Sequence, residues 1–277
     1  ESSLSLESGV ADVWLLKGGV LFELGRFEEA LEAFDRTTAL AADNTTAWYR
    51  KGRTYIELQN PEDAIACFDQ VLAHDAACAP AWLRKGSTLL SLSRFDPALD
   101  ALPRDLAIKP GSAYGWYDRA IALSELGRHE EAVSSYDRVL AINPRYANAW
   151  YDKGIALTKL GKDFQAVEAF EQATTIDPRF VHAFYDKGLA FARLSKDKDA
   201  IVSFDRAIAV EPSQAPINYH TGLSLKNLDR PDEALQAFDA ALELDAGSYE
   251  TWFNKGIILF NLMRFEESDA AFDSAIN

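Results

Sequence analysis

The sequence has few cysteines, little positive charge and no long apolar run, and each shortage excludes a class of protein. Its two cysteines, Cys67 and Cys78, cannot make a disulfide framework, so we expect a reducing compartment such as the cytoplasm. The net charge of −15 at pH 7 disfavours nucleic acid, because phosphate binding needs clustered lysine and arginine. No apolar run of about 18 residues is present, so we expect no insertion into a membrane.

Catalytic and metal-binding patterns are also missing. The four histidines lie far apart along the chain, and the pair His74 and Cys78 is only a weak metal signal. No G-x-S-x-G elbow, phosphate loop or H-E-x-x-H pattern occurs. We therefore predict a protein that is not an enzyme and that has no cofactor, no catalytic residue and no metal site.

What the sequence does contain is an internal repeat of constant length. A mostly aromatic residue, which we call the repeat anchor, recurs at this constant spacing: Trp14, Trp48, Trp82, Trp116, Trp150, Phe184, Asn218 and Trp252. Glycine stands four residues after every anchor except one, where Ala120 replaces it. A small residue and then a large one follow each anchor at fixed positions, as Ala30 and Phe34 follow Trp14. Eight copies in one register predict a repeat protein.

Each repeat predicts two helices and a turn. The first helix begins just before the anchor and ends near the leucine ten residues later, and Gly25, Gly127 and Gly161 suit the turn that follows. The second helix ends before prolines such as Pro144 and Pro178. Because one such pair buries too little apolar surface to fold alone, the repeats must stack.

These residues resemble the tetratricopeptide repeat, with its W-x2-L-G-x2-Y, A-x3-F and P pattern. The resemblance covers residues 11–277 as a single domain, in units starting at 11, 45, 79, 113, 147, 181, 215 and 249, after an N-terminal flank at 1–10. It implies an all-α fold, a right-handed superhelical α-solenoid of eight helix-turn-helix repeats, with the first helices lining a concave groove for peptides or proteins. The family's carboxylate clamp needs lysine and asparagine on the groove series, and this sequence lacks them there.

A cation stands three residues after most anchors, where the family favours leucine. The series is Lys17, Lys51, Lys85, Arg119, Lys153, Lys187 and Lys255, with Thr221 the exception. An acid follows at a fixed position in the second half of the same units, except at Pro103. A half-buried ammonium needs a partner, so we predict a ladder of lysine–carboxylate contacts between first and second helices. The spacing leaves open whether each contact closes within a repeat or between repeats.

The third repeat is irregular. Pro103 lies inside its second helix, which costs a backbone hydrogen bond unless the helix bends. Asp105 stands where other repeats have small or apolar residues. We expect a tolerated kink with Asp105 turned toward solvent or toward Lys85. The alternative is a bend that reshapes the groove for a partner.

The candidate partner-binding residues lie one, two and five positions after the anchors, on the groove side by resemblance. Tyrosine offers area and a hydroxyl to a peptide, although it could equally serve packing between repeats. The charged members change from basic to acidic along the chain, which would orient an extended partner. The set is Tyr49, Arg50, Arg53, Arg84, Tyr117, Asp118, Tyr151, Asp152, Tyr185, Asp186, Tyr219 and Phe253.

The sequence thus predicts a non-catalytic adaptor or scaffold that binds a peptide or partner protein in its groove. One alternative is the recruiting domain of a larger enzyme. Another is self-assembly, by end-to-end homo-association through Phe272 and Ile276, because no polar helix covers the last repeat. Since the chain begins with Glu1 and its last unit looks truncated, we expect the native protein to continue.

Overall fold

The computed structural model describes residues 2–276, and side chains from residue 9 onward. The described residues form sixteen helices and no strand, so the predicted all-α solenoid fold is confirmed. The helices are α1 (Ser2–Glu23), α2 (Phe27–Leu40), α3 (Thr45–Glu57), α4 (Pro61–His74), α5 (Ala79–Ser91), α6 (Phe95–Ile108), α7 (Ala113–Glu125), α8 (His129–Ile142), α9 (Ala147–Lys159), α10 (Asp163–Ile176), α11 (Val181–Arg193), α12 (Asp197–Val210), α13 (Ala215–Asn227), α14 (Pro231–Leu244), α15 (Tyr249–Asn261) and α16 (Phe265–Ile276).

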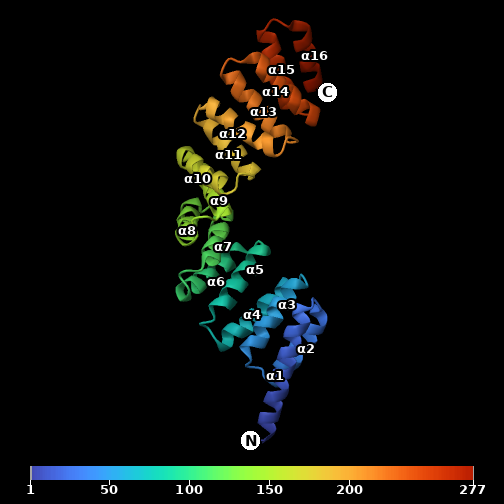
Figure 1. Ribbon diagram of the computed structural model, residues 1–277, viewed down its shortest axis with the longest axis vertical. Helices are drawn as coiled ribbons and strands as arrows, with labels where there is room; N and C mark the ends of the chain where they lie inside the picture. The colour runs from blue at the N-terminus through green and yellow to red at the C-terminus, as the bar shows by residue number, and fades with distance from the viewer. Residues whose placement is uncertain (1, 277) are drawn as a thin grey trace. The chain divides into compact units, whose positions relative to one another are not determined.

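The chain forms two compact units, one ending at Asn143 and the other beginning at Pro144, so each holds four repeats. Within each unit the helices pair as hairpins, and each hairpin packs against the next along the chain (Figure 1). The first helix differs from the expectation, because α1 begins at Ser2 and the N-terminal flank is therefore helical as well.

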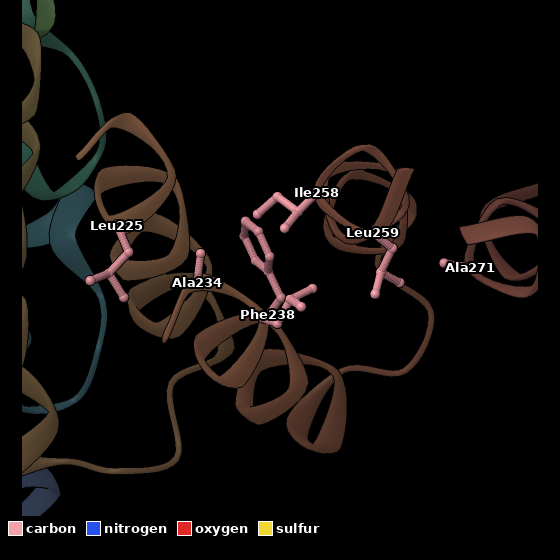
Figure 2. Packing of buried hydrophobic residues seen from close by; sticks show 7 residues of the cluster. Leu225, Ala234, Phe238, Ile258, Leu259 and Ala271 are labelled. Carbon is pink, nitrogen blue, oxygen red and sulfur yellow. The ribbon is translucent and has the colours of Figure 1, made fainter. Parts of the chain in front are cut away.

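The repeated glycine and the repeated large residue make the core of each hairpin. Phe204 and Phe238 are fully buried. A Cβ placed on Gly222 would lie only 2.5 Å from the Phe238 ring, so the two helices approach closely because the first carries glycine there. Figure 2 shows the Phe238 ring among apolar side chains of α13, α14 and α15. Each such core therefore joins a hairpin to the next one.

The anchor tryptophans have a role beyond filling space. Their rings are only half-buried, and from Trp48 onward each indole Nε1 donates a hydrogen bond to a backbone carbonyl six residues earlier, in the loop that links two repeats. In Trp48 the acceptor is the Ala42 oxygen at 2.8 Å, and in Trp150 it is the Pro144 oxygen at 2.9 Å. The tryptophan thus fastens the loop that precedes its own helix.

The turn inside each hairpin uses a left-handed residue in all eight repeats. Gly25, Gly127 and Gly161 have φ values of 72°, 73° and 70°, which confirms the predicted role of these glycines. In the other five repeats a residue with a side chain takes the same conformation, as Ser195 does with a φ of 57°. A side chain there costs about 1–2 kcal/mol relative to glycine.

The predicted ladder exists, and it closes between repeats. In four rungs the lysine pairs with the acid on the second helix of the preceding repeat; these lysines are Lys51, Lys85, Lys187 and Lys255. The nitrogen–oxygen distance is 2.6 Å for Lys51 and Asp35 and 2.5 Å for Lys85 and Asp69. The Lys51 ammonium also lies 5.0 Å from the Trp48 ring centroid. This lysine is therefore held between an aromatic ring of its own helix and a carboxylate of the neighbouring repeat.

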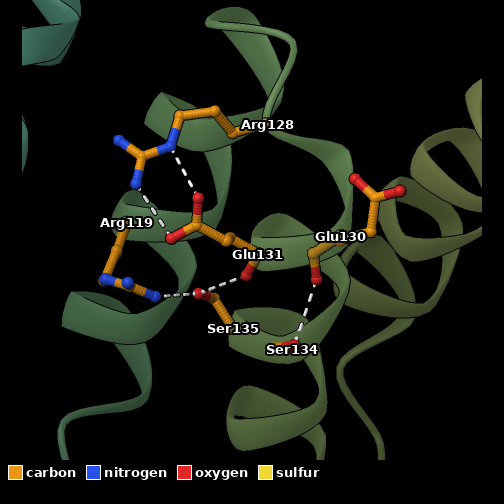
Figure 3. Close-up of polar contacts among 6 residues, drawn as sticks. All are labelled: Arg119, Arg128, Glu130, Glu131, Ser134 and Ser135. Atoms are coloured by element: carbon orange, nitrogen blue, oxygen red, sulfur yellow. Dashed lines mark hydrogen bonds and ion pairs between the residues drawn. The ribbon is translucent and has the colours of Figure 1, made fainter.

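The fourth repeat shows what happens when the acid is missing. The partner of its cation would stand at position 103, which is proline, and the cation there is Arg119. Arg119 instead donates to the Ser135 hydroxyl on the second helix of its own repeat (Figure 3). Nearby, Arg128 pairs with Glu131 at 2.7 Å, which holds the pKa of that carboxyl below its usual value.

Both predicted positions of Asp105 are wrong. The α6 helix continues through Pro103 to Ile108, and the Asp105 side chain is buried, with 1% of its surface exposed. Lys85 is unavailable because it pairs with Asp69. Asp105 lies instead against the first turn of α7, beside Ser112 and Gly115. The other repeats have no glycine at the position of Gly115, and a Cβ there would overlap the Asp105 carboxyl.

Candidate binding face

The candidate residues come from the first helices of the repeats, and we call the surface that they form in each unit the first-helix face. Its aromatic members lie one position after the anchors and are half-buried, except Phe253, which is 41% exposed. Each of these rings packs on the large core residue of its own repeat. The centroid distances are 5.8 Å for Tyr49 and Phe68, 6.0 Å for Tyr185 and Phe204, and 6.1 Å for Phe253 and Phe272. Tyr117 and Tyr219 pack in the same way.

The tyrosine hydroxyls can also bond to the next repeat. Tyr151 donates to the Asp186 carboxylate at 2.8 Å. Burial, with the negative charge of Asp186 beside it, raises the pKa of Tyr151 far above its ordinary value, so the phenol stays protonated as a donor. The same tyrosine can therefore contribute to packing and to recognition, because its ring packs on a core residue while its hydroxyl donates a hydrogen bond to a carboxylate of the face.

The acids of this face are half-buried, and two of them have raised pKa values. Asp118 accepts a hydrogen bond from the Ser87 hydroxyl, and Asp186 accepts one from Tyr151. Burial raises the pKa of both carboxyls despite these bonds. Asp152 is half-buried in the corresponding position of its repeat. These carboxylates would be stabilised by a cationic group of a partner.

The basic members lie on α3 and α5 of the first unit. Arg50 and Arg84 are exposed, and Arg53 is half-buried with its guanidinium 4.9 Å from the Phe22 ring centroid. In the positions that correspond to Arg50 and Arg84, the second unit presents Asp152, Asp186, His220 and Asn254. Burial lowers the pKa of His220, so its imidazole is neutral at pH 7. The two units thus present first-helix faces of different charge.

Sequence reasoning missed two hollows of the first unit. One, of about 470 Å³, lies between α1 and α3 and is lined by Leu16, Gly19, Val20 and Phe22 together with Arg50 and Arg53. The signal for it was Gly19, which stands where every other repeat has a side chain. The other, of about 380 Å³, brings Tyr49, Arg84 and Asp118 together with the buried Asp105. Both hollows lie on the first-helix face or at its edge.

Within the described residues, no three histidine, cysteine or acidic side chains are arranged to hold a metal ion. The same part of the chain contains no helix with the length and apolar character needed to cross a bilayer. Cys67 and Cys78 are both free thiols.

Four family models, all described as tetratricopeptide or TPR repeats, match residues 21–85, 122–161, 147–180, 165–216 and 219–276. The chain belongs to the tetratricopeptide repeat family. The matches lie in both units, and the helix pairs described above are tetratricopeptide repeats. No curated protein matches the chain.

Solved structures share this fold. The C-terminal part of a TPR repeat-containing protein from Cytophaga hutchinsonii is 15% identical with a TM-score of 0.74, over 86% of this chain and 97% of that one. MamA from Desulfovibrio magneticus RS-1 is 24% identical with a TM-score of 0.57, over 61% and 95%. YrrB, titled as a TPR protein with an unusual peptide-binding site, is 22% identical with a TM-score of 0.59, over 63% and 90%. At these identities the likeness establishes the fold alone.

Proposed function

We propose that the chain is a non-catalytic adaptor that binds a peptide or a segment of a partner protein on its first-helix faces. Membership of the tetratricopeptide repeat family supports a role as a protein-interaction scaffold. The observation that carries the proposal is the combination of aromatic rings and half-buried charged groups on successive first helices. Rings held by packing lose little entropy on binding, and partly buried charges discriminate between partners.

We further propose that the eight repeats act as one binding domain over residues 11–277 and that the protein works in the cytoplasm. The free thiols of Cys67 and Cys78 support a reducing compartment. This role is the same if the chain is the recruiting domain of a larger enzyme, because the binding residues would be unchanged.

A peptide-display selection tests the proposal. Peptides selected on the intact chain should lose affinity for a Tyr151→Ala/Tyr185→Ala variant, which removes two aromatic members of the face. The control is Val202→Ser, because Val202 is 61% exposed on the second helix α12. Circular dichroism must report equal helicity in all three proteins. Selected peptides that bind the tyrosine variant as tightly as the intact chain would refute the proposal.

A second candidate function is end-to-end homo-association through Phe272 and Ile276. In its favour, Ile276 is 80% exposed, and at the other end Val13 and Val20 of α1 are 65% and 61% exposed. Against it, Phe272 already packs on Phe253, and Asp269 takes a place that leucine, isoleucine or valine holds in the other repeats. Light scattering over a dilution series decides: a monomer throughout, with no change in Ile276→Glu, removes this candidate.

A further inference from the structure

The hollow between α1 and α3 includes a position where α1 has no side chain. Gly19 lies in the interior of α1, and the equivalent residues of the other repeats are arginine, serine, isoleucine or leucine. A Cβ on Gly19 would overlap the Nη1 atom of Arg50. Glycine there leaves room for the Arg50 side chain beside α1, and both residues line a cavity of about 470 Å³. We call this cavity the N-terminal arginine pocket.

The pocket combines an apolar lining with two guanidinium groups. Leu16 and Val20, which are 68% and 61% exposed, line it together with Phe22. The Arg53 guanidinium lies over the Phe22 ring, an arrangement that leaves its N–H groups available to an acceptor. An apolar surface of this kind favours burial of an apolar side chain, and the guanidiniums favour a carboxylate next to it.

Several arginines of the described residues form no ion pair, and the two arginines of the pocket are among them. Neither Arg50 nor Arg53 forms an ion pair among the described residues, although Glu23 also lines the pocket. Elsewhere arginines at helix starts are paired, as Arg26 is with Glu29 at 2.5 Å and Arg230 with Glu233 at 2.6 Å. In a chain with 43 acidic and 28 basic residues, two neighbouring guanidiniums that form no ion pair favour an acidic ligand at this surface.

We propose that the N-terminal arginine pocket binds a segment of a partner protein in which an apolar side chain is flanked by acidic side chains. The apolar side chain enters between Leu16, Val20 and Phe22, and the flanking carboxylates accept hydrogen bonds from Arg50 and Arg53. This inference rests on the proposed function and specifies the chemistry of the partner at one site of the first unit.

Fluorescence anisotropy tests the proposal with a fluorescein-labelled peptide whose Leu-Phe pair is flanked by glutamates and whose C-terminus is amidated. The comparison peptides carry lysines in place of the glutamates, or serines in place of Leu-Phe. We expect binding of the first peptide alone, with affinity that falls as the salt concentration rises. Equal binding of the lysine peptide, or no binding of the glutamate peptide, would overturn the proposal.

Two variants locate the site. Arg50→Glu/Arg53→Glu removes the cations, and Gly19→Leu fills the pocket and displaces the Arg50 guanidinium without changing the net charge. Leu189 and Leu223 stand at the equivalent position of their repeats, so leucine fits this helix. We expect each variant to lose at least tenfold in affinity. The matched control is Arg36→Glu/Arg179→Glu, which changes the net charge equally at two exposed sites and should leave affinity unchanged. A glutamate peptide that binds both pocket variants as tightly as the intact chain would overturn the assignment.

Two further outcomes would also overturn it. Binding only by a peptide with a free C-terminal carboxylate would make the chain end the ligand. Self-association that Arg50→Glu/Arg53→Glu abolishes would make a second copy the occupant. The proposed function is judged separately, because its test uses Tyr151 and Tyr185 of the other unit.

Discussion

The contact between Asp105 and Gly115 predicts that the effect of a Gly115 substitution on stability changes sign when Asp105 is also replaced. Asp105 is buried where α6 meets the first turn of α7, and its Oδ2 atom has no hydrogen-bond partner. A Cβ on Gly115 would overlap that oxygen. One repeat earlier the same two positions hold Val71 and Ala81, which pack together in one apolar cluster. We therefore predict that Gly115→Ala destabilises the natural chain but stabilises an Asp105→Val variant.

The magnitude follows from two opposing effects. Alanine in place of glycine stabilises a helix by up to about 1 kcal/mol. Forcing an extra methyl group into a filled site costs about 1–3 kcal/mol. In the natural chain the second effect exceeds the first, and we expect a net loss of about 1 kcal/mol. With valine at 105 the overlap with the carboxyl is gone, so the same substitution should gain about 0.5–1 kcal/mol. The coupling between the two sites is the difference between these effects, about 1.5–2 kcal/mol.

Urea unfolding of the four proteins of this cycle, followed by circular dichroism at pH 7, measures the coupling. Because repeat arrays can unfold in parts, hydrogen exchange at α6 and α7 should show that the change is local. If Gly115→Ala has the same effect in both backgrounds within about 0.5 kcal/mol, the two residues act independently and the reasoning fails.

Three other substitutions test the architecture. Burial raises the pKa of Asp105 above its ordinary 3.8. The native state therefore loses stability as the pH rises through the raised pKa, because the carboxyl must then ionise in a buried site. Asp105→Asn should remove this loss when the free energy of unfolding is measured against pH. Ser195→Gly relieves a left-handed side chain and should stabilise by about 1 kcal/mol, whereas a lower urea midpoint would contradict this. Lys51→Leu restores the residue that the family favours and should change the unfolding free energy by less than about 1 kcal/mol, because its Asp35 partner is 54% exposed; a larger loss would show that the ladder is a major source of stability.

The repeat pattern made the hairpins predictable because every repeat obeys the same packing rule. The glycine that follows the anchor and the large residue of the second helix meet in space, and Gly222 with Phe238 shows the contact. The helix-ending roles of Gly25 and Pro144 follow from local backbone chemistry. None of these predictions needs the position of a distant residue.

The direction of the ladder was not predictable because two acids lie at nearly equal separations from most lysines. Lys51 has Asp35 before it and Asp69 after it at almost the same distance along the chain, and both acids stand on second helices that pack against its own. Only the position of each helix decides between them, and the structure selects Asp35. The place of Asp105 was hidden for a related reason. Its burial depends on Gly115, whose missing side chain has no meaning until α6 and α7 are packed together.

The sequence predicts which residues form the first-helix face, but it does not predict the two hollows on that face or at its edge. The tyrosines follow from the register, whereas their packing on core rings depends on the second helix. The N-terminal arginine pocket includes a departure from the register, at Gly19. Positions that depart from the repeat pattern therefore indicate the structural features that are particular to one repeat.

Arg119 is a second position where a departure from the repeat pattern accompanies a local difference in structure. At the ladder position of the preceding repeat, Pro103 stands in place of the acid that pairs with lysine in the other rungs. Arginine has more donors and a longer reach, and Arg119 uses them on Ser135 of its own repeat. Burial lowers the pKa of Arg119 without making it neutral, so the charge is retained, and the nearby charge of Glu131 stabilises it. Loss of an acid in one repeat is thus accompanied by a different cation and a hydroxyl in the next, which is the change expected if each rung of the ladder is a contact between neighbours.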